Sequence, residues 1–377
     1  MQNAEIIIVG GGPAGLSTAG ALKRCGLNAV VLDKNDRIGD SWLQRYKRLH
    51  LHTVRGFSGL AHYPIPRHFP KYIHKDLYAE YLQDYANHFD LQCVMNSRVL
   101  KVRTNEKEND DNLIVETNDE TWHSPVVVIA TGQFGTPIIP TWSGLDEFQG
   151  TIIHSVEYKT GGDYVGKRVL VIGSGNSGAE IAADLAECGA ESVAISIRTP
   201  PAIVPRDFLG TPTQIFGILM SRLPPRFADR VGSILARLAL GDLRRYGIKA
   251  PAWLPFTSKR TPIIDVGFIK QVKSGNVKVR PTIASFRPAG VLYHDGQEES
   301  LDAVIAATGF TTGLDQLLGI SGILDVKGFP LYPPGRPTPV PGLFFMGFIE
   351  TNRGHLYEAN IASRQLAKIV VKYLSKT

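Results

Sequence analysis

The sequence predicts an α/β protein with two doubly wound parallel sheets. Residues 6–9 form a short apolar run that leads into a G-x-G-x-x-G turn, and a helical stretch and a second apolar run follow. The same order of features recurs from residue 169. Uninterrupted apolar runs are typical of parallel strands that are buried on both faces. Two such motifs therefore predict two parallel sheets, each with its own glycine turn.

The first motif has the parts of a dinucleotide site. Gly10 makes the tight turn, Gly12 lets the backbone approach a pyrophosphate, and Gly15 lets helix and strand pack closely. The N–H groups and the positive dipole end of the helix then face the phosphates. The second apolar run, 29–32, ends in Asp33, which can accept hydrogen bonds from a ribose hydroxyl. The complete order of parts favours dinucleotide binding over a plain glycine-rich turn.

Composition limits the class of protein. A hydrophobic content of 43% and a charged content of 20% are globular values. The odd number of cysteines, with no close pair, favours a reducing cytoplasm over a secreted disulfide scaffold. The first strand begins so early that we expect no signal peptide, and no apolar run is long enough to cross a bilayer. A net charge of +6 without a dense basic tract suits an anionic cofactor rather than nucleic acid.

The segment after Asp33 is expected to run back toward the cofactor. Trp42 is an aromatic candidate for stacking near a flavin, although a single Trp is more often plain packing. His50 and His52 alternate, but no third ligand cluster accompanies them, so we expect no metal site. Residues 77–85 read as an amphipathic covering helix.

Residues 99–121 predict a strand pair joined by a surface turn, NEKENDDN. A buried strand at 126–130 then ends in Ala130-Thr131-Gly132. The Pro- and Gly-rich segment after it is the first expected domain boundary.

The second motif differs from the first at its end. Its glycines are Gly173, Gly175 and Gly178, its helix is expected at 179–187, and its second strand ends in Arg198. A guanidinium at the place of Asp33 attracts a 2′-phosphate and offers it a planar fork. We therefore expect FAD on the first motif and NADPH on the second. The alternative is that Arg198 is a solvated surface cation.

Residues 213–250 interleave six arginines with aliphatic residues, and positions 231–238 have helical spacing. A basic amphipathic helix can lie on a membrane, but more often it covers a core. We expect this one to roof a substrate cavity, without contact with a membrane surface. Further on, a strand ends in Ala307-Thr308-Gly309, a last strand falls in 342–348, and a helix with an apolar stripe spans 356–374.

Together these motifs resemble the flavin-containing monooxygenases over nearly the whole chain. FQGTIIHSVEY fits that family's pattern F-x-G-x-x-x-H-x-x-x-Y through Phe148, Gly150, His154 and Tyr158. The segments RLALGDLRRYGI, RTPIIDVGFIKQVKSGNVKV and FPKYIHKDLYAEYL are most similar to the YUCCA-type enzymes, which convert indole-3-pyruvate to indole-3-acetate. Asp33 stands where the family usually has Glu, and the tail GFIETNRGHLYEANIASRQLA differs from the YUCCA ending.

The resemblance implies that an NADPH domain, 148–284, is inserted into an FAD domain made of 1–147 and 285–377. It implies that the N-terminus of the last helix, near Leu356, points at the flavin ring. The FAD positions would be Gly10, Gly12, Pro13, Ala14, Gly15, Asp33, Lys34, Trp42, His52, Val99, Ala130, Thr131, Gly132 and Leu356. The NADP positions would be Gly173, Ser174, Gly175, Asn176, Ser177, Gly178, Arg198, Ala307, Thr308 and Gly309.

The implied reaction is an NADPH-dependent monooxygenation. NADPH would pass a hydride to FAD, and a flavin hydroperoxide formed with O2 would transfer one oxygen atom to a small organic substrate. Because the flavin carries the chemistry, no catalytic side chain is assigned, and His154 and Tyr158 are family-motif positions only. An aromatic 2-oxo acid such as indole-3-pyruvate is the first candidate substrate, with Arg206 and Arg353 as loosely placed candidates for its carboxylate.

Other functions stay open. The same frame could serve N- or S-oxygenation, Baeyer-Villiger chemistry, or an NADPH oxidase that makes hydrogen peroxide. A non-catalytic flavin-binding sensor would bind FAD without NADPH-driven reduction. A disulfide reductase would need a redox-active cysteine pair, and the chain has no C-x-x-C. A homodimer is also left open.

Overall fold

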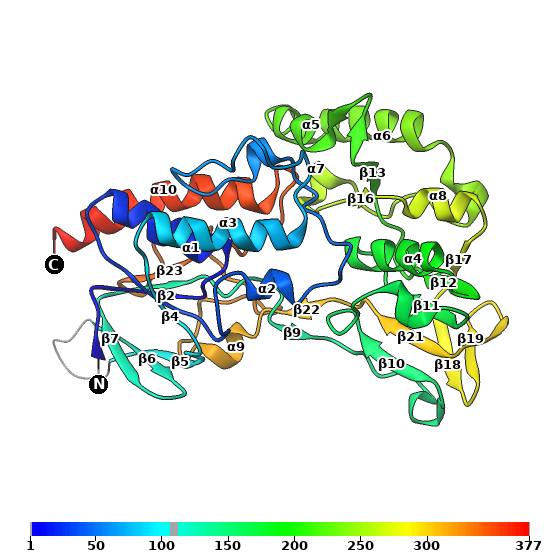
Figure 1. Ribbon diagram of the computed structural model, residues 1–377, viewed down its shortest axis with the longest axis horizontal. Helices are drawn as coiled ribbons and strands as arrows, with labels where there is room; N and C mark the ends of the chain where they lie inside the picture. The colour runs from blue at the N-terminus through cyan, green and yellow to red at the C-terminus, as the bar shows by residue number, and fades with distance from the viewer. Residues whose placement is uncertain (1, 106–111, 377) are drawn as a thin grey trace.

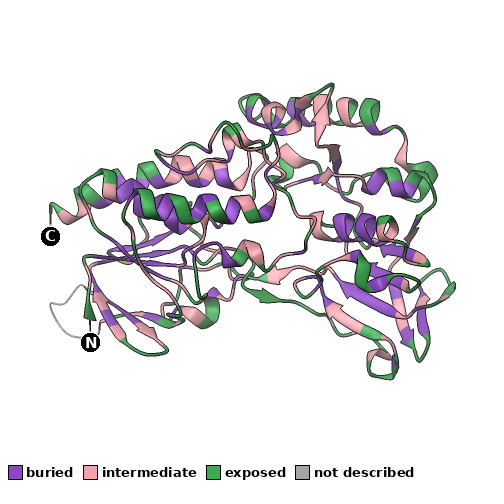
Figure 2. Cartoon of the chain, in the orientation of Figure 1, coloured by how far each residue is buried: buried purple, intermediate pink, exposed green. Residues whose placement is uncertain are grey.

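The computed structural model describes residues 2–105 and 112–376. Its centre is two parallel sheets that stand side by side (Figure 1). We call each sheet, with the layers that cover it, the first unit and the second unit. Figure 2 shows the buried residues concentrated in both sheets and in the helix faces turned toward them. The predicted α/β class with two parallel sheets is confirmed.

The first sheet has the strand order β23-β8-β2-β3-β4, and all its strands are parallel. These strands are β2 (Ile6–Val9), β3 (Val30–Leu32), β4 (Gln92–Val94), β8 (Val126–Ile129) and β23 (Leu343–Phe345). All four residues of β2 are buried, because alternate side chains point into different layers. This burial on both faces explains the uninterrupted apolar run.

Helices cover one face of the first sheet and strands cover the other (Figure 1). The helices are α1 (Pro13–Arg24) and α10 (His355–Leu374), with α3 (Lys75–His88) beside α1. The opposite layer is a small sheet in the order β1-β7-β6-β5, together with α9 (Leu314–Leu317). Its strands are β1 (Gln2–Asn3), β5 (Val99–Thr104), β6 (Leu113–Thr117) and β7 (Thr121–Ser124).

The second sheet repeats this plan. Its parallel order is β10-β21-β11-β12-β17. The strands are β10 (Thr151–His154), β11 (Arg168–Ile172), β12 (Ser192–Ser196), β17 (Val277–Arg280) and β21 (Ala303–Ala306). The helices α4 (Asn176–Cys188) and α8 (Phe268–Lys273) pack on one face. An antiparallel sheet of β18 (Ile283–Arg287), β19 (Gly290–Tyr293) and β20 (Glu298–Ser300) covers the other.

The boundary predicted at 284/285 does not coincide with the end of the second sheet. Strand β21 lies between β10 and β11 in the second sheet, and β18–β20 cover that sheet, so residues up to Ala306 belong to the second unit. The chain crosses between the units where β9 (Thr136–Pro137) pairs with β22 (Phe310–Thr311). It returns to the first sheet at β23. The assignment of one cofactor to each unit remains a prediction.

A helical roof lies over the junction of the units (Figure 1). It contains α5 (Thr213–Met220), α6 (Pro225–Leu240) and α7 (Pro255–Ser258), next to the paired strands β13 (Ile203–Pro205) and β16 (Ile263–Asp265). The hairpin β14 (Asp207–Phe208) and β15 (Thr211–Pro212) precedes α5. Asp229 of α6 accepts hydrogen bonds from the backbone N–H groups of Phe256 and Thr257, which ties α6 to α7.

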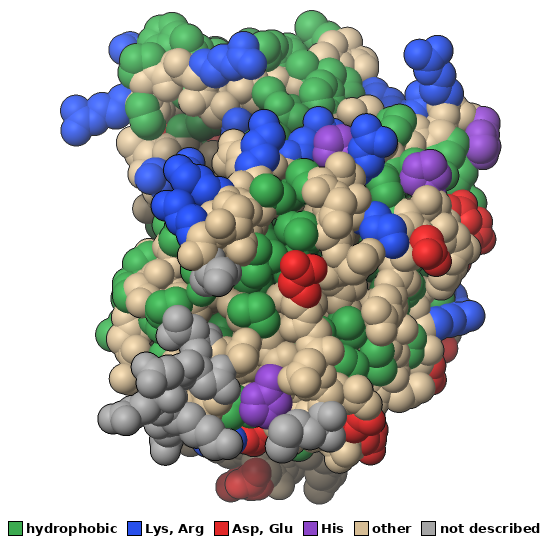
Figure 3. Space-filling model, turned by 90° about the vertical axis from the view of Figure 1, so that its left-hand side faces the viewer, with side chains coloured by type: hydrophobic (Ala, Val, Ile, Leu, Met, Phe, Trp, Pro, Cys, Tyr) green, Lys and Arg blue, Asp and Glu red, His purple; other side chains and the backbone are tan. Residues whose placement is uncertain are grey.

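The remaining elements are short. They are α2 (Asp40–Leu43) and the 3-10 turns Arg55–Phe57, Leu145–Glu147, Gly161–Tyr164 and Leu243–Tyr246. The predicted strand pair at 99–121 is confirmed as β5 and β6, whereas the turn NEKENDDN falls mainly outside the described residues. None of the helices within 2–105 and 112–376 is long and apolar enough to cross a membrane. On the end of the molecule shown in Figure 3, Lys and Arg side chains gather over the helical layer.

Candidate active site

The two glycine turns have the same backbone geometry. Gly10 and Gly173 have φ values of +109° and +112°, a region that L side chains rarely adopt. A Cβ on Gly15 would lie 1.9 Å from the carbonyl oxygen of Gly10, and one on Gly178 would lie 2.1 Å from that of Gly173. These positions therefore require glycine for the close approach of helix and strand.

The middle glycine of each turn faces open space. Gly12 and Gly175 are the N-caps of α1 and α4, with φ, ψ of −77°, −178° and −86°, −178°. Apart from their chain neighbours, no described heavy atom lies within 4 Å of a Cβ built on either residue. Among the described side chains, none caps the first N–H groups of these two helices. Both helix ends can therefore receive an anionic group.

A single cavity of about 1460 Å³ lies between the units and beneath the roof. All the predicted FAD positions except Gly15 line it: Gly10, Gly12, Pro13, Ala14, Asp33, Lys34, Trp42, His52, Val99, Ala130, Thr131, Gly132 and Leu356. Of the predicted NADP positions, Asn176 and Ser177 line it. The described lining does not include the other eight: Gly173, Ser174, Gly175, Gly178, Arg198, Ala307, Thr308 and Gly309.

Asp33 and Arg198, which follow the second strand of each motif, have different surroundings. The Asp33 carboxylate accepts hydrogen bonds from the backbone N–H of Gly11 at 2.5 Å and from the backbone and side-chain N–H groups of Asn35, both at 2.8 Å. Asp33 thus fixes the first turn and borders the cavity. Arg198 is exposed, two residues beyond β12. Its guanidinium is accessible to a ligand that approaches from solvent.

Trp42 packs within the first unit, whereas His52 contacts the second unit. The ring of Trp42 meets that of Tyr78 edge-on, with centroids 4.8 Å apart. His52 contacts the carboxylate of Glu180 on α4 through its Nε2 atom, so the predicted flavin-contacting loop touches the second unit. Glu180 is buried, and burial followed by this carboxylate raises the pKa of Tyr46 well above its usual range. Tyr46 also lines the cavity.

The two family-motif side chains lie in the second unit. His154 accepts a hydrogen bond at Nδ1 from the backbone N–H of Val156 (3.2 Å), while its Nε2 is 3.1 Å from the carbonyl oxygen of Gly309. The ring is therefore neutral, with the proton on Nε2, and burial lowers the pKa of His154. Tyr158 donates to Asp184 of α4 at 2.6 Å. Both side chains hold backbone or helix positions and neither lines the cavity among the described residues.

The two arginines proposed to bind the substrate carboxylate differ in their contacts. Arg353 forms a bidentate ion pair with Glu358, at 2.6 and 2.7 Å, so its charge is already compensated. Arg206 lies over the ring of Tyr72, 4.3 Å from the centroid, and lines the cavity. The nearby Asp207 is committed to Lys71 and Tyr72. Arg206 is thus the better placed of the two to meet an anionic group.

Sequence reasoning missed several residues in or next to the cavity: Gln214, Gln133 and Asn352 line it, whereas Glu180 contacts the lining residue His52. Glu180 could have been flagged as a carboxylate inside an apolar helical stretch. Gln214 of α5 accepts from the N–H of Val54 and donates to the carbonyl of Arg353, both at 2.8 Å, but no local pattern marks it. Among the described residues, the buried oxygens Oε1 of Gln133 and Oδ1 of Asn352 have no hydrogen-bond partner, and both residues line the cavity.

Apolar side chains of the roof form the upper wall of the cavity. They include Ile203, Phe208, Phe216, Met220, Leu240 and Ile248. Basic side chains lie around its rim, including Lys34, Arg45, Arg98, Lys159, Arg237 and Arg244. Within the described parts of the chain, no group of three or more His, Cys, Asp or Glu side chains could hold a metal ion.

Known proteins are similar to this chain in sequence or in fold. Indole-3-pyruvate monooxygenase YUCCA6 of Arabidopsis thaliana is 36% identical over 386 residues, covering 97% of this chain and 90% of that protein. A flavin-containing monooxygenase from Stenotrophomonas maltophilia has a TM-score of 0.75 at 26% identity, covering 99% of this chain and all of that one. Oxidized steroid monooxygenase bound to NADP shares the fold, with a TM-score of 0.76 at 19% identity over all of this chain and 87% of that chain.

A family model described as flavin-binding monooxygenase-like matches residues 3–371. This match spans both sheets, the roof and the last helix. The chain is therefore an enzyme that belongs to the flavin-binding monooxygenase-like family.

Proposed function

We propose that the protein is an FAD- and NADPH-dependent monooxygenase that inserts one atom of O2 into a small organic substrate. The observation that carries this proposal is the pair of matching glycine turns, one in each unit: Gly10 and Gly12 of the first turn line the cavity, and Asn176 and Ser177 after the second turn also line it. Two turns of this kind suit two dinucleotides. The acidic end at Asp33 suits the ribose of FAD, and the exposed Arg198 suits the 2′-phosphate of NADPH.

The residues present fit both cofactors. At Gly12 and Gly175 the backbone leaves open space beside a helix N-terminus, where a pyrophosphate oxygen can be held by N–H groups. The basic rim of the cavity favours anionic groups. The unpartnered oxygens of Gln133 and Asn352 would be costly in a buried site without a ligand that donates to them, and hydroxyl or amide groups of a cofactor could do so.

The side chains around the cavity would bind the cofactors and exclude water, and would not react themselves. When bound, FAD supplies the redox and oxygen-transfer chemistry that side chains lack. Asp33 fixes the first turn and offers an oxygen to a ribose hydroxyl. The apolar roof excludes water from the reacting groups. His154, neutral and bonded to the carbonyl of Gly309, holds the residue that precedes β22 in place.

For the substrate, we propose an aromatic 2-oxo acid as the first candidate. Relatives named indole-3-pyruvate monooxygenases support this class, and so does the position of Arg206 beside the apolar roof. A guanidinium can form a charge-assisted pair with the acid's carboxylate while the apolar wall receives an aromatic ring. Arg353 is withdrawn from this role because Glu358 already occupies its guanidinium.

Turnover under labelled oxygen tests the proposal. The purified holoenzyme would be supplied with NADPH, 18O2 and a panel of indole-3-pyruvate, amines, sulfides and ketones. We expect one labelled oxygen atom in the product of at least one substrate, with NADPH consumed in proportion and little peroxide. If NADPH is consumed, all the oxygen leaves as hydrogen peroxide, and no substrate gains label, the protein is an NADPH oxidase instead.

A further inference from the structure

Three carboxylates of α4 face the first unit along one stripe. Glu180, Asp184 and Glu187 are separated by four and three residues, so they lie on the same side of the helix. Their partners come from residues 44–53, where Leu51 packs in the core of the first unit and Tyr46 packs in the core of the second. His52 contacts Glu180, and Arg48 reaches both of the other two carboxylates.

Residues 44–53 are anchored to the first unit through their backbone. The N–H of Leu51 donates to the carbonyl of Ile73 at 2.8 Å, and the N–H of Lys75 donates to the carbonyl of Leu49 at 3.0 Å. Toward the second unit, the N–H of Lys47 donates to the carbonyl of Lys159 at 2.8 Å. We call residues 44–53 the crossing segment, because it joins both units.

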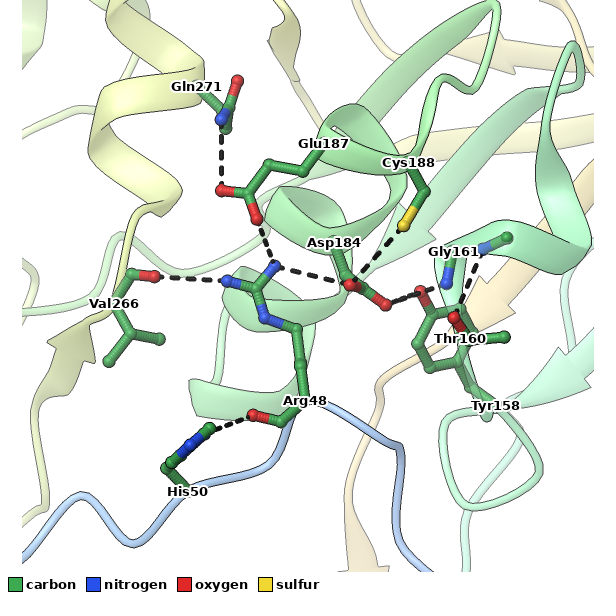
Figure 4. Close-up of polar contacts among 11 residues, drawn as sticks. Arg48, His50, Tyr158, Thr160, Gly161, Asp184, Glu187, Cys188, Val266 and Gln271 are labelled. Atoms are coloured by element: carbon green, nitrogen blue, oxygen red, sulfur yellow. Dashed lines mark hydrogen bonds and ion pairs between the residues drawn. The ribbon is translucent and has the colours of Figure 1, made fainter. Parts of the chain in front are cut away.

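Arg48 is the centre of the polar contacts between the crossing segment and the second unit (Figure 4). Its Nη1 atom is 2.9 Å from Oε2 of Glu187 and 3.5 Å from Oδ1 of Asp184. Its Nη2 atom donates to the carbonyl of Val266 at 3.4 Å. The side chains of Arg48 and Asp184 are 22% and 12% exposed, so this pair is less screened than a surface pair, whereas Glu187 is 43% exposed and its charge is more screened.

The carboxylate of Asp184 connects Arg48 to the family motif (Figure 4). Its Oδ2 accepts from the hydroxyl of Tyr158 at 2.6 Å and from the N–H of Gly161 at 2.8 Å, leaving Oδ1 toward Arg48. On the other side, Gln271 donates to Oε1 of Glu187 at 3.2 Å. Both carboxylates are therefore held by the second unit in the positions that receive the guanidinium.

The neighbours of Arg48 line the cavity, but Arg48 is not among the described residues that do so. Leu49, His50, Leu51 and His52 border it on one side, while α4 supplies Asn176 and Ser177 on the other. A change at Arg48 would shift these two walls relative to each other without removing a contact to a ligand.

We propose that Arg48 is a positioning residue that fixes the first unit against the second, so that the two bound cofactors meet in reacting geometry. This inference rests on the proposed function, since it assumes FAD in the first unit and NADPH in the second. Hydride transfer depends steeply on the distance between the reacting atoms, whereas the binding of each cofactor depends on contacts within its own unit. Loss of Arg48 should therefore slow reduction and spare binding.

The test compares holoenzyme variants at Arg48. In Arg48→Met, which keeps the apolar stem, anaerobic reduction of the flavin by saturating NADPH should slow about 10- to 100-fold. FAD content and the Kd for NADP should stay within about twofold of the unaltered protein. Hydrogen exchange of the crossing segment should rise. Arg48→Lys should recover part of the rate, because an ammonium can reach one carboxylate but cannot span both.

Arg103→Met is the matched control. Arg103 pairs with Glu116 at 2.8 Å inside the β5–β6 sheet of the first unit and is 37% exposed. This variant should keep both the reduction rate and the exchange pattern. A wild-type reduction rate in Arg48→Met, or a Kd for NADP that rises in proportion to the lost rate, would overturn the proposal.

The exchange measurement separates the failure of this inference from failure of the proposed function. If NADPH does not reduce the unaltered protein, the proposed function fails. Faster exchange in the crossing segment and in α4 of Arg48→Met would then still support Arg48 as the residue that joins the units. Unchanged hydrogen exchange would overturn the inference that Arg48 joins the two units. If Arg48→Met does not fold, the same measurements on Arg48→Lys decide.

Discussion

The two glycine turns are built alike but end differently. Gly10 and Gly173 share a positive φ, and Gly12 and Gly175 share an open N-cap position. At the following strand ends, however, Asp33 is tied into its own turn, whereas Arg198 stands exposed beyond β12. The shared part suits what all dinucleotides have in common, the pyrophosphate, and the different part can distinguish one dinucleotide from another.

This comparison separates glycines that the fold requires from glycines that a ligand would require. Gly15 and Gly178 lack space for a Cβ because the backbone of their own unit is in the way. Gly12 and Gly175 have space, and only a bound group would fill it. Substitutions at the two kinds of position should therefore have different consequences.

The largest effect should come from the packed glycines. Gly15→Val and Gly178→Val place a side chain against a carbonyl oxygen at about 2 Å, which should reduce the free energy of unfolding by on the order of 4 kcal/mol. Urea denaturation of the FAD-free proteins would measure this loss, with Gly12→Ala as the control whose stability should equal that of the FAD-free unaltered protein. Equal losses at Gly12 and Gly15 would contradict the distinction.

The next effect concerns the end of the second motif. Arg198→Glu should remove a phosphate contact and add repulsion, costing on the order of 2–4 kcal/mol in selectivity for NADPH over NADH. The ratio of kcat/KM for the two nucleotides measures it. Arg287→Glu, an exposed change in the β18–β20 sheet, should leave the ratio unaltered. Equal use of both nucleotides by the unaltered protein would refute the assignment.

Smaller effects are expected at Arg206 and Arg353, on kcat/KM for the first residue and on stability for the second. Arg206→Met should lower kcat/KM for a 2-oxo acid by about 2 kcal/mol, since it removes a charge-assisted pair, and should leave stability nearly unchanged. Arg353→Met should instead lower stability, because it removes the ion-pair partner of the Glu358 carboxylate and leaves only the hydroxyl of Thr351 bonded to it. Thermal unfolding and kinetics on both variants would check this. An amine or sulfide substrate should be insensitive to Arg206.

The smallest effect should be on the way the free energy of unfolding depends on pH. Burial lowers the pKa values of His154 in the second unit and His355 in the first. The unfolded chain therefore binds more protons at these sites below about pH 6.5, and stability should fall as the pH drops below that value. His154→Gln should make this dependence shallower in urea titrations. An unchanged slope would mean that His154 does not contribute.

The sequence predicted the strands well because each unit depends on local apolar runs and glycine spacing. The runs at β2, β8, β11 and β21 were visible since burial on both faces leaves no polar residue. The second domain boundary could not be predicted in the same way. Whether β21 joins the first or the second sheet depends on pairing with β10 and β11, which is not a local property.

The site was predictable only where a residue belongs to a local motif. Asp33, Trp42 and Ala130, which were predicted as FAD positions, line the cavity, and their contact with FAD remains a prediction. Glu180, Gln214 and Asn352 were missed because their importance comes from segments that are distant in the chain. Arg353 differs from these residues, because its partner Glu358 is a near neighbour in the first turn of α10 and already occupies its guanidinium.

The central claim is that the first turn holds FAD and the second holds NADPH. Gly12→Ala and Gly175→Ala test it most directly, because both positions have room for a Cβ in the folded chain. The measurement is FAD content after purification, together with the Kd for NADP on whatever holoenzyme remains. The account predicts that Gly12→Ala loses FAD, whereas Gly175→Ala keeps FAD and binds NADP more weakly. The opposite pattern, or two variants that bind both cofactors normally, would contradict the account.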